Sequence, residues 1–155
     1  MIRIPVHPIR RRDKAIIDEV EMKEILKEAK YVTIAMSQGD EPYLVTLSHG
    51  FDDERKCIYF HCAREGKKIE ILSANPRIWG QALVDNGYQQ GKCNHLYKTT
   101  QFHGKVAFVD DQAEMQHALR VMIRHLDDDP ERVIREQITP HSMGRILIGR
   151  IDITT

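Results

Sequence analysis

The sequence CIYFHCAREGKKIE, residues 57–70, contains the change from strand to helix on which the predicted fold depends. Successive residues of a strand point to opposite sides of a sheet, so the first six residues predict one apolar face and one mixed face. The apolar face, expected to line the interior, holds Ile58, Phe60 and Cys62, and the opposite face holds Cys57, Tyr59 and His61. Residues 66–73 then predict a short helix, which Asn75-Pro76 ends because the residue before a proline disfavours helical backbone.

The start of that helix carries Lys67 and Lys68 directly after Gly66. The unpaired N–H groups of a first helical turn bear partial positive charge and ordinarily favour acidic side chains. Two lysines at this place therefore predict a bound anion such as a phosphate, held by free amides and ammonium groups together. The alternative is a pair of solvated lysines on a frayed helix. His61 ends the preceding strand, where an imidazole could stack on or hydrogen-bond a bound ring, with a structural role as the alternative.

Turn residues and apolar periodicity predict further elements on both sides of this segment. Strands are expected at residues 31–36, 43–51, 78–84, 96–109 and 146–153, and helices after Asp18 and at residues 111–126 and 130–138. The strands follow one another along the chain, and the helices are too few for regular βαβ alternation. This pattern indicates a mainly β fold, in which a six-stranded antiparallel sheet closes into a small barrel with peripheral helices. The length fits a single domain, residues 1–155, in which residues 1–17 form an N-terminal arm.

The strand expected at residues 43–51 is partly apolar on both faces. Tyr43, Val45 and Leu47 alternate along it with Leu44, Thr46 and Ser48. A strand of this kind needs cover on both sides. The barrel core would cover one face, and a partner subunit or a flat ligand would cover the other.

Composition and missing motifs exclude several classes of function. The 23 basic and 23 acidic residues balance, so no general field favours nucleic acid or an anionic membrane. No apolar run approaches the roughly 20 residues of a membrane span. We therefore expect a cytoplasmic protein with no nucleic-acid or membrane partner. The sequence lacks P-loop, GxGxxG, GxSxG and HExxH motifs, which excludes classical NTPases, Rossmann dehydrogenases, α/β-hydrolases and zincins.

The histidines and cysteines do not follow a metal-ligand spacing. The three cysteines are odd in number and form no CxxC pair, so neither a disulfide framework nor a zinc ribbon is expected. The side chains considered as ligands are His49, His61, His95, His103, Cys62 and Cys93. Their separations match no short ligand rule, and no metal site is predicted. A heme ligand from His61, His49 or Cys62 remains an open alternative.

Motifs in order along residues 11–109 resemble the FMN-binding split-barrel superfamily, in particular its pyridoxamine 5'-phosphate-oxidase-like and 5-nitroimidazole-resistance (Nim) branch. The most specific match is IYFHCAREGKKI, residues 58–69, which is similar to the branch's YFHxA-xxGxK segment. Three further stretches resemble its basic motif, its PY-x-V-P-L strand and its Y-x-S-V strand, namely RRDK at residues 11–14, EPYLVTLSHGFD at residues 41–52 and YKTT at residues 97–100. The chain departs from the pattern where Thr46 replaces the usual proline and Thr99 replaces serine.

The resemblance implies a homodimeric split barrel with FMN at the subunit interface. The phosphate would lie against the helix start at residues 66–68 and the hydroxyl of Thr99, and the ring along the 43–48 strand near His61. The cofactor-binding residues expected from the resemblance are Val45, Thr46, Leu47, Ser48, His61, Cys62, Gly66, Lys67, Lys68, Tyr97 and Thr99. His61 is also the expected catalytic residue.

The expected function is that of an FMN-dependent oxidoreductase, similar to nitroimidazole reductases, that passes electrons from NADPH or NADH to a small electron-poor acceptor. The protein would fix the flavin ring and tune it by hydrogen bonds. The alternative is a non-catalytic flavin- or heme-binding protein on the same barrel, because no general acid or base other than His61 is evident in the segment.

Overall fold

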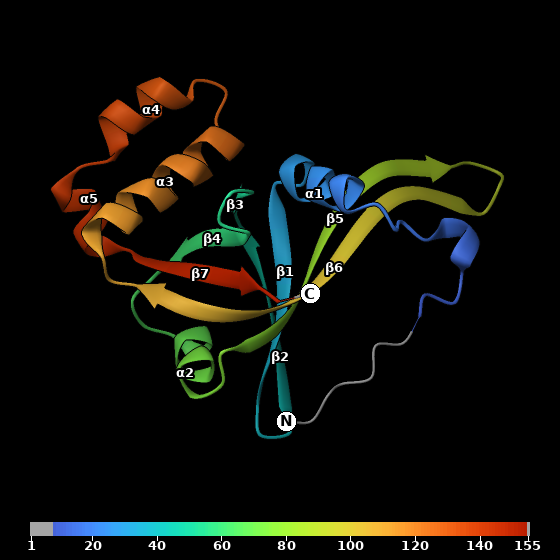
Figure 1. Cartoon of the computed structure of the whole chain (residues 1–155), viewed down its shortest axis with the longest axis horizontal. Helices are drawn as coiled ribbons and strands as arrows, with labels where there is room; N and C mark the ends of the chain where they lie inside the picture. Colours follow the sequence, from blue (N-terminus) through green and yellow to red (C-terminus); the bar gives the residue numbers. More distant parts are fainter. Residues whose placement is uncertain (1–7, 155) are drawn as a thin grey trace.

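The structure is a computed structural model that describes residues 8–154. Its central element is one curved sheet of seven antiparallel strands (Figure 1). The strands are β1 (Tyr31–Gln38), β2 (Glu41–Ser48), β3 (Gly50–Asp52), β4 (Cys57–Cys62), β5 (Arg77–Gln89), β6 (Asn94–Val109) and β7 (Leu147–Ile153). Their order in the sheet is β2-β1-β5-β6-β7-β4-β3. The predicted mainly β split barrel with peripheral helices is confirmed. In detail it has seven strands instead of six, and its sheet is not closed, because the edge strands β2 and β3 do not pair with each other within residues 8–154.

Within the same described residues, five α-helices and one short 3-10 helix flank the sheet. They are η1 (Arg12–Lys14), α1 (Glu19–Glu28), α2 (Lys67–Ala74), α3 (Gln112–Leu126), α4 (Pro130–Gln137) and α5 (Pro140–Arg145). Helices α1 to α4 confirm the four predicted helices, and Asp18 and Asp111 cap α1 and α3 by accepting hydrogen bonds from backbone amides. The sequence pattern does not predict α5, whose six residues are too few to show apolar periodicity. The predicted N-terminal arm contains η1, and its residues 1–7 lie outside the described part.

The additional strand arises because residues 43–51, predicted as one strand, divide at His49 into β2 and β3. Pairing of β2 with β1 ends at Ser48, and pairing of β3 with β4 begins at Gly50. The His49 side chain is fully buried, and its ring nitrogen Nε2 donates a hydrogen bond to the carbonyl of Leu26 in α1, at 2.9 Å. A Cβ atom at Gly50 would lie 2.8 Å from the backbone of α3, so glycine allows that helix to pack directly against the corner.

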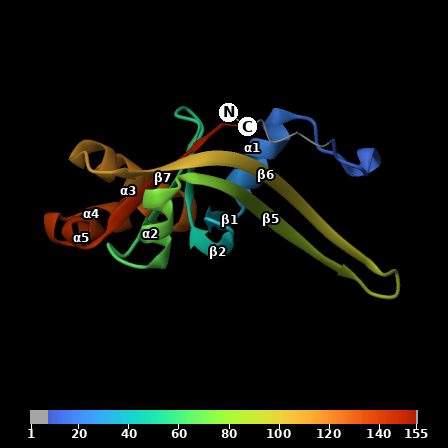
Figure 2. The ribbon, with the colours of Figure 1, turned by 90° about the horizontal axis from the view of Figure 1, so that it is seen from below.

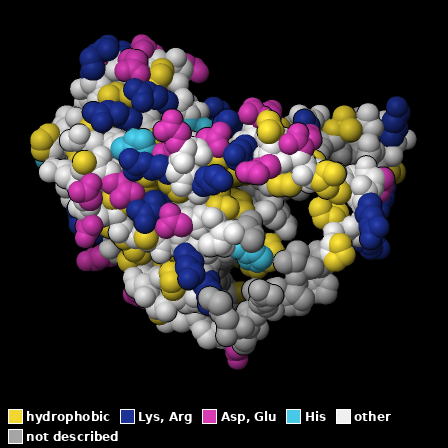
Figure 3. All heavy atoms as spheres, viewed as in Figure 1, with side chains coloured by type: hydrophobic (Ala, Val, Ile, Leu, Met, Phe, Trp, Pro, Cys, Tyr) yellow, Lys and Arg dark blue, Asp and Glu magenta, His cyan; other side chains and the backbone are white. Residues whose placement is uncertain are grey.

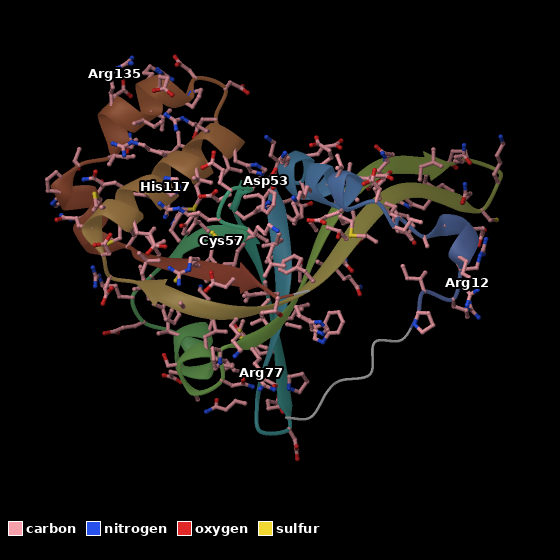
Figure 4. The ribbon with its side chains drawn as sticks, in the orientation of Figure 1. Arg12, Asp53, Cys57, Arg77, His117 and Arg135 are labelled. Atoms are coloured by element: carbon pink, nitrogen blue, oxygen red, sulfur yellow. The ribbon has the colours of Figure 1, made fainter. Side chains whose placement is uncertain are left out.

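Apolar clusters lie on both sides of β4. One contains Ile58 and Phe60, which pack with residues of α1 and α2. The other contains Cys57 and Tyr59, both 0% exposed, beneath α3. Apart from the exposed His61, the β4 face expected to point away from the interior is therefore buried as well. Figure 4 shows His117 of α3 above Cys57, in keeping with this second layer.

Strands β5 and β6 continue as a ribbon that projects from the body of the molecule (Figure 2). The strands predicted at residues 78–84 and 96–109 leave a connection between them, yet strand pairing continues to Gln89 and Asn94, after an irregularity near Asp85. Four large apolar or aromatic side chains on this ribbon, residues 83–97, are 40–55% exposed: Leu83, Tyr88, Leu96 and Tyr97. Because an isolated two-stranded ribbon is marginal in water, the exposed side chains predict a further covering surface.

Candidate functional site

The first turn of α2 presents free backbone amides. Gly66 precedes the helix with φ of 140°, a conformation that favours glycine, and no side chain caps this end. The first amides that bond back to the Gly66 carbonyl are those of Ile69 at 3.1 Å and Glu70 at 3.2 Å. The N–H groups of Lys67 and Lys68 therefore have no partner inside the helix, as expected for a first turn. This turn has the donors and the positive charge that a phosphate requires.

Lys67 connects this turn to β2. Its Nζ atom lies 4.6 Å from the centroid of the Tyr43 ring, a cation–π distance. Lys68 is half-buried near the Cys62 thiol. Burial raises the pKa of Cys62, and the positive charge of Lys68 opposes that shift. The structure thus brings together the helix start, the first part of β2 and the end of β4.

The predicted β2 residues divide between the two faces of the strand. Leu47 is buried and Val45 half-buried against the core, whereas Thr46 and Ser48 are exposed. The Thr46 hydroxyl lies 3.0 Å from that of Thr33 on β1. The side of the sheet that bears Thr33 also carries a shallow hollow of about 510 Å³, lined by Thr33, Ala35, Leu44, Trp79, Gly80, Gln81 and Gln101. Its shape and mixed lining suit a flat ligand or a second protein surface.

Tyr97 and Thr99 are not brought to the α2 turn within one chain. Both lie on β6, on the ribbon side of the molecule, whereas α2 lies at the opposite end of the sheet (Figure 1). Tyr97 is 55% exposed, and the Thr99 hydroxyl donates a hydrogen bond to the carbonyl of Ala82 at 3.0 Å. A single chain therefore holds the predicted phosphate residues in two separate places.

His61 lines a cavity that the sequence does not predict. The cavity measures about 290 Å³ and lies between the end of β4 and helices α3, α4 and α5; we call it the α3–α5 cavity. Most of its lining is apolar and includes Leu119 and Ile123 of α3. The Thr46 and Ser48 side chains are not among its lining residues, so within one chain His61 faces the helices instead of the outer surface of β2.

A polar network joins α3 to the sheet. The His117 ring lies 2.6 Å from the buried carboxylate of Asp52. Glu114 accepts hydrogen bonds from Tyr59 at 3.2 Å and from Arg150 at 2.7 Å. These contacts leave no local sign in the sequence, because their partners are 36 to 65 positions apart in the chain. The N-cap Asp111 marks the start of α3 but not the strand residues that this helix contacts.

His49 forms a buried contact that responds to pH. Its ring centroid lies 4.6 Å from that of His125, whose own ring bonds to the Ala29 carbonyl at 2.6 Å. The Nδ1 atom of His49 is buried and has no hydrogen-bond partner among the described residues. Burial lowers the pKa of His49 to about 4, with smaller contributions from His125 and Lys30.

We expect this histidine to make the fold sensitive to acid. The unfolded chain binds a proton at His49 near pH 6.5, and the folded chain does so only near pH 4. The contribution to stability is therefore complete above about pH 6.5 and decreases as the pH falls toward 4, by about 3 kcal/mol in total. Urea unfolding at pH 7.5 and pH 5 measures this slope. His49→Gln should flatten it, and an equal slope in the variant would contradict the assignment.

Three surface and composition features bear on possible partners: the distribution of charge, the length and polarity of the helices, and potential metal ligands. On the face shown in Figure 3, basic and acidic side chains are interspersed over α3, α4 and α1. No helix in the described part is both long enough and apolar enough to cross a membrane. Within residues 8–154, no cluster of three or more His, Cys, Asp or Glu side chains could hold a metal ion.

Comparison with known proteins gives one match at the level of a family. The family model described as pyridoxamine 5'-phosphate oxidase matches residues 18–155. No curated protein matches the chain.

Solved structures match the fold over most of the chain. A protein from Bacteroides thetaiotaomicron assigned to 5-nitroimidazole antibiotic resistance is 22% identical, with a TM-score of 0.75 over 90% of this chain and 82% of that one. A flavocytochrome from Azotobacter vinelandii is 16% identical, with a TM-score of 0.78 over 95% and 69%. The FAD and heme binding protein from Mycobacterium smegmatis is 11% identical, with a TM-score of 0.73 over 91% and 69%. At these identities the likeness shows a common fold.

Proposed function

Because the chain belongs to the pyridoxamine 5'-phosphate oxidase family, we propose that it is a cytoplasmic FMN-dependent oxidoreductase that reduces a small electron-poor acceptor, in the manner of a nitroimidazole reductase. The observation that carries the proposal is the first turn of α2. Its free amides and two lysines suit a phosphate, and the Lys67 contact with Tyr43 joins that turn to β2. The residues present therefore fit the phosphate end of a flavin nucleotide.

Bound FMN would supply the electron-transfer chemistry, with NADPH or NADH as donor. The part of this chain is to hold and orient the cofactor. Gly66, Lys67 and Lys68 bind the phosphate. The β2 residues Val45 to Ser48 would lie along the ring, with the backbone and the exposed hydroxyls of Thr46 and Ser48 as hydrogen-bonding groups. His61 and Cys62 lie at the end of β4, and His61, which faces helices α3 to α5, would contact the ring or the acceptor from that side.

The separation of Tyr97 and Thr99 from α2 favours a site shared by two copies of the chain. In a two-fold dimer, the ribbon of one copy would bring these residues to the α2 turn of the other. The same contact would cover the exposed apolar side chains of the ribbon. The proposed dimer therefore completes the cofactor site and explains the ribbon.

The dimer can be tested with a variant of the ribbon. We expect the wild-type chain to be a dimer at micromolar concentration by size exclusion with light scattering. Leu96→Asp should produce monomers and weaken FMN binding at least tenfold, since binding depends on assembly. Val20→Asp, at a side chain 64% exposed on α1, is the matched control and should change neither property. A monomer that still retains FMN would contradict the shared site.

The activity is tested by visible spectra of the purified protein. We expect flavin absorption bands that NADPH or NADH bleaches and that a nitroimidazole acceptor restores. Cofactor released by heat and separated by chromatography should be FMN. A protein that binds no flavin would overturn the proposal.

A second candidate function is a non-catalytic flavin or heme carrier. His61 favours it, because an exposed imidazole beside an apolar cavity is an arrangement that a heme iron uses. Addition of hemin would then give a Soret band that His61→Ala abolishes. A flavin that nicotinamide donors do not bleach would likewise favour a carrier.

A further inference from the structure

The α3–α5 cavity is not filled by the side chains that surround it. Leu119, Ile123 and Val133 all line it and all remain half-buried. Helix α4, which supplies Val133, has no fully buried residue, although one side of the helix is apolar. Helices α3, α4 and α5 thus surround a volume of about 290 Å³ without closing on it. An engineered apolar cavity of roughly 150 Å³ suffices to bind benzene, so a molecule of one or two rings fits this volume.

Polar side chains in the lining are few, namely His61, Asp127, Gln137 and Ser142. The Ser142 hydroxyl already bonds to the Gln137 carbonyl at 2.5 Å and takes part in the capping box with Thr139. His61 differs, because no hydrogen bond to its ring is made by any group of residues 8–154. Its two ring nitrogens can donate to or accept from a bound molecule.

The charges around the cavity oppose an anion. Asp127 lines it at the end of α3, where the helix terminus also carries partial negative charge. No lysine or arginine belongs to the lining within the described residues. A carboxylate or phosphate would therefore be desolvated there without a fixed cation to pair with.

From this lining we propose that the α3–α5 cavity binds a small, uncharged aromatic molecule of one or two rings, through apolar contacts with α3 and α4 and one hydrogen bond to His61. The site is separate from the phosphate turn of α2 and from the hollow on the sheet. Binding in this cavity is independent of the proposed function. To identify the bound molecule with the electron acceptor would rest on that function, because His61 belongs to both sites. Ligand binding itself does not require a flavin.

The test uses a matched pair of probes, 2-naphthol and 2-naphthoate, which share two rings and differ in charge. Calorimetric titration of the full chain should show 2-naphthol binding and at least tenfold weaker binding of 2-naphthoate. Two-dimensional NMR spectra of methyl groups should place the shifts caused by 2-naphthol at Leu119 and Ile123. Absence of binding, or equal binding of both probes, would overturn the proposal.

Variants of α4 locate the site. Val133→Trp places a large ring into the cavity and should reduce 2-naphthol affinity at least tenfold. Arg135→Trp adds the same side chain to the outer side of the same helix, where Figure 4 shows Arg135, and should leave the affinity unchanged. His61→Phe keeps the apolar volume and removes the hydrogen bond, so a three- to tenfold loss is expected. Circular dichroism confirms that each variant is folded, and wild-type affinity in a folded Val133→Trp would refute the assignment.

The outcomes separate this proposal from the flavin function. FMN content is measured in the same samples by absorbance. Binding of 2-naphthol in a protein that takes no FMN supports the cavity and overturns the flavin function. A Soret band on addition of hemin, lost in Val133→Trp, assigns the cavity to heme and overturns the small-ligand proposal.

Discussion

Lys68→Glu should abolish retention of FMN, with a loss of affinity of roughly a hundredfold or more. Lys68 occupies the first turn of α2, where the backbone amides already attract an anion. Reversal of its charge replaces a charge-assisted hydrogen bond by repulsion in a half-buried position. The measurement is the dissociation constant for FMN, from quenching of flavin fluorescence by the refolded or flavin-free protein.

Two further variants show whether the effect is local. Lys68→Gln removes the charge without reversal and should cost about tenfold in affinity, from one lost charge-assisted bond. Arg135→Glu reverses a charge on α4, far from α2 in Figure 4, and should bind FMN like the wild type. If Lys68→Glu keeps a native circular dichroism spectrum and an unchanged FMN affinity, the phosphate is held elsewhere.

His61→Ala should slow reoxidation of the reduced flavin by the acceptor about a hundredfold while most FMN stays bound. The proposed phosphate turn, which we expect to supply much of the cofactor affinity, is untouched by this change. A positioned proton donor or acceptor commonly contributes a factor of 100 or more to a rate. Stopped-flow spectroscopy measures the reoxidation, and equilibrium dialysis measures the bound FMN.

A structural role for His61 would give another pattern. Thermal stability and bound cofactor would then decrease together, without a selective loss of rate. His141→Ala removes an exposed histidine of α5 outside the lining of the α3–α5 cavity and should leave both measurements unchanged. Normal reoxidation in a stable, FMN-loaded His61→Ala would exclude this residue from the chemistry.

Local sequence signals determined most of the elements. Helices α1 and α3 begin at Asp18 and Asp111, because a carboxylate that accepts from the first amides acts within three residues of its own position. The apolar alternation of Ile58, Phe60 and Cys62 correctly predicts the interior face of β4. The bare, lysine-bearing start of α2 is equally local, since it needs only a helix boundary and two side chains.

Which element packs on each face of a strand or helix depends on the tertiary structure. The division of residues 43–51 at His49 depends on the Leu26 carbonyl of α1 and on the close approach of α3 to Gly50, neither of which leaves a sign in the strand itself. The second face of β4 is buried because α3, more than 50 positions later, packs on Tyr59. Alternation specifies which side chains share a face, but the element that covers a face is set by the path of the whole chain.

The same distinction applies to the site. The first turn of α2, proposed as the phosphate site, could be predicted from the sequence because its parts are neighbours in the chain. The hollow on the sheet, the Asp52–His117 contact and the α3–α5 cavity join residues that lie far apart along the chain, and a cavity is defined by where packing fails to fill space. His61 therefore faces α3 to α5 because those helices pack around the end of β4, and that packing depends on the path of the whole chain.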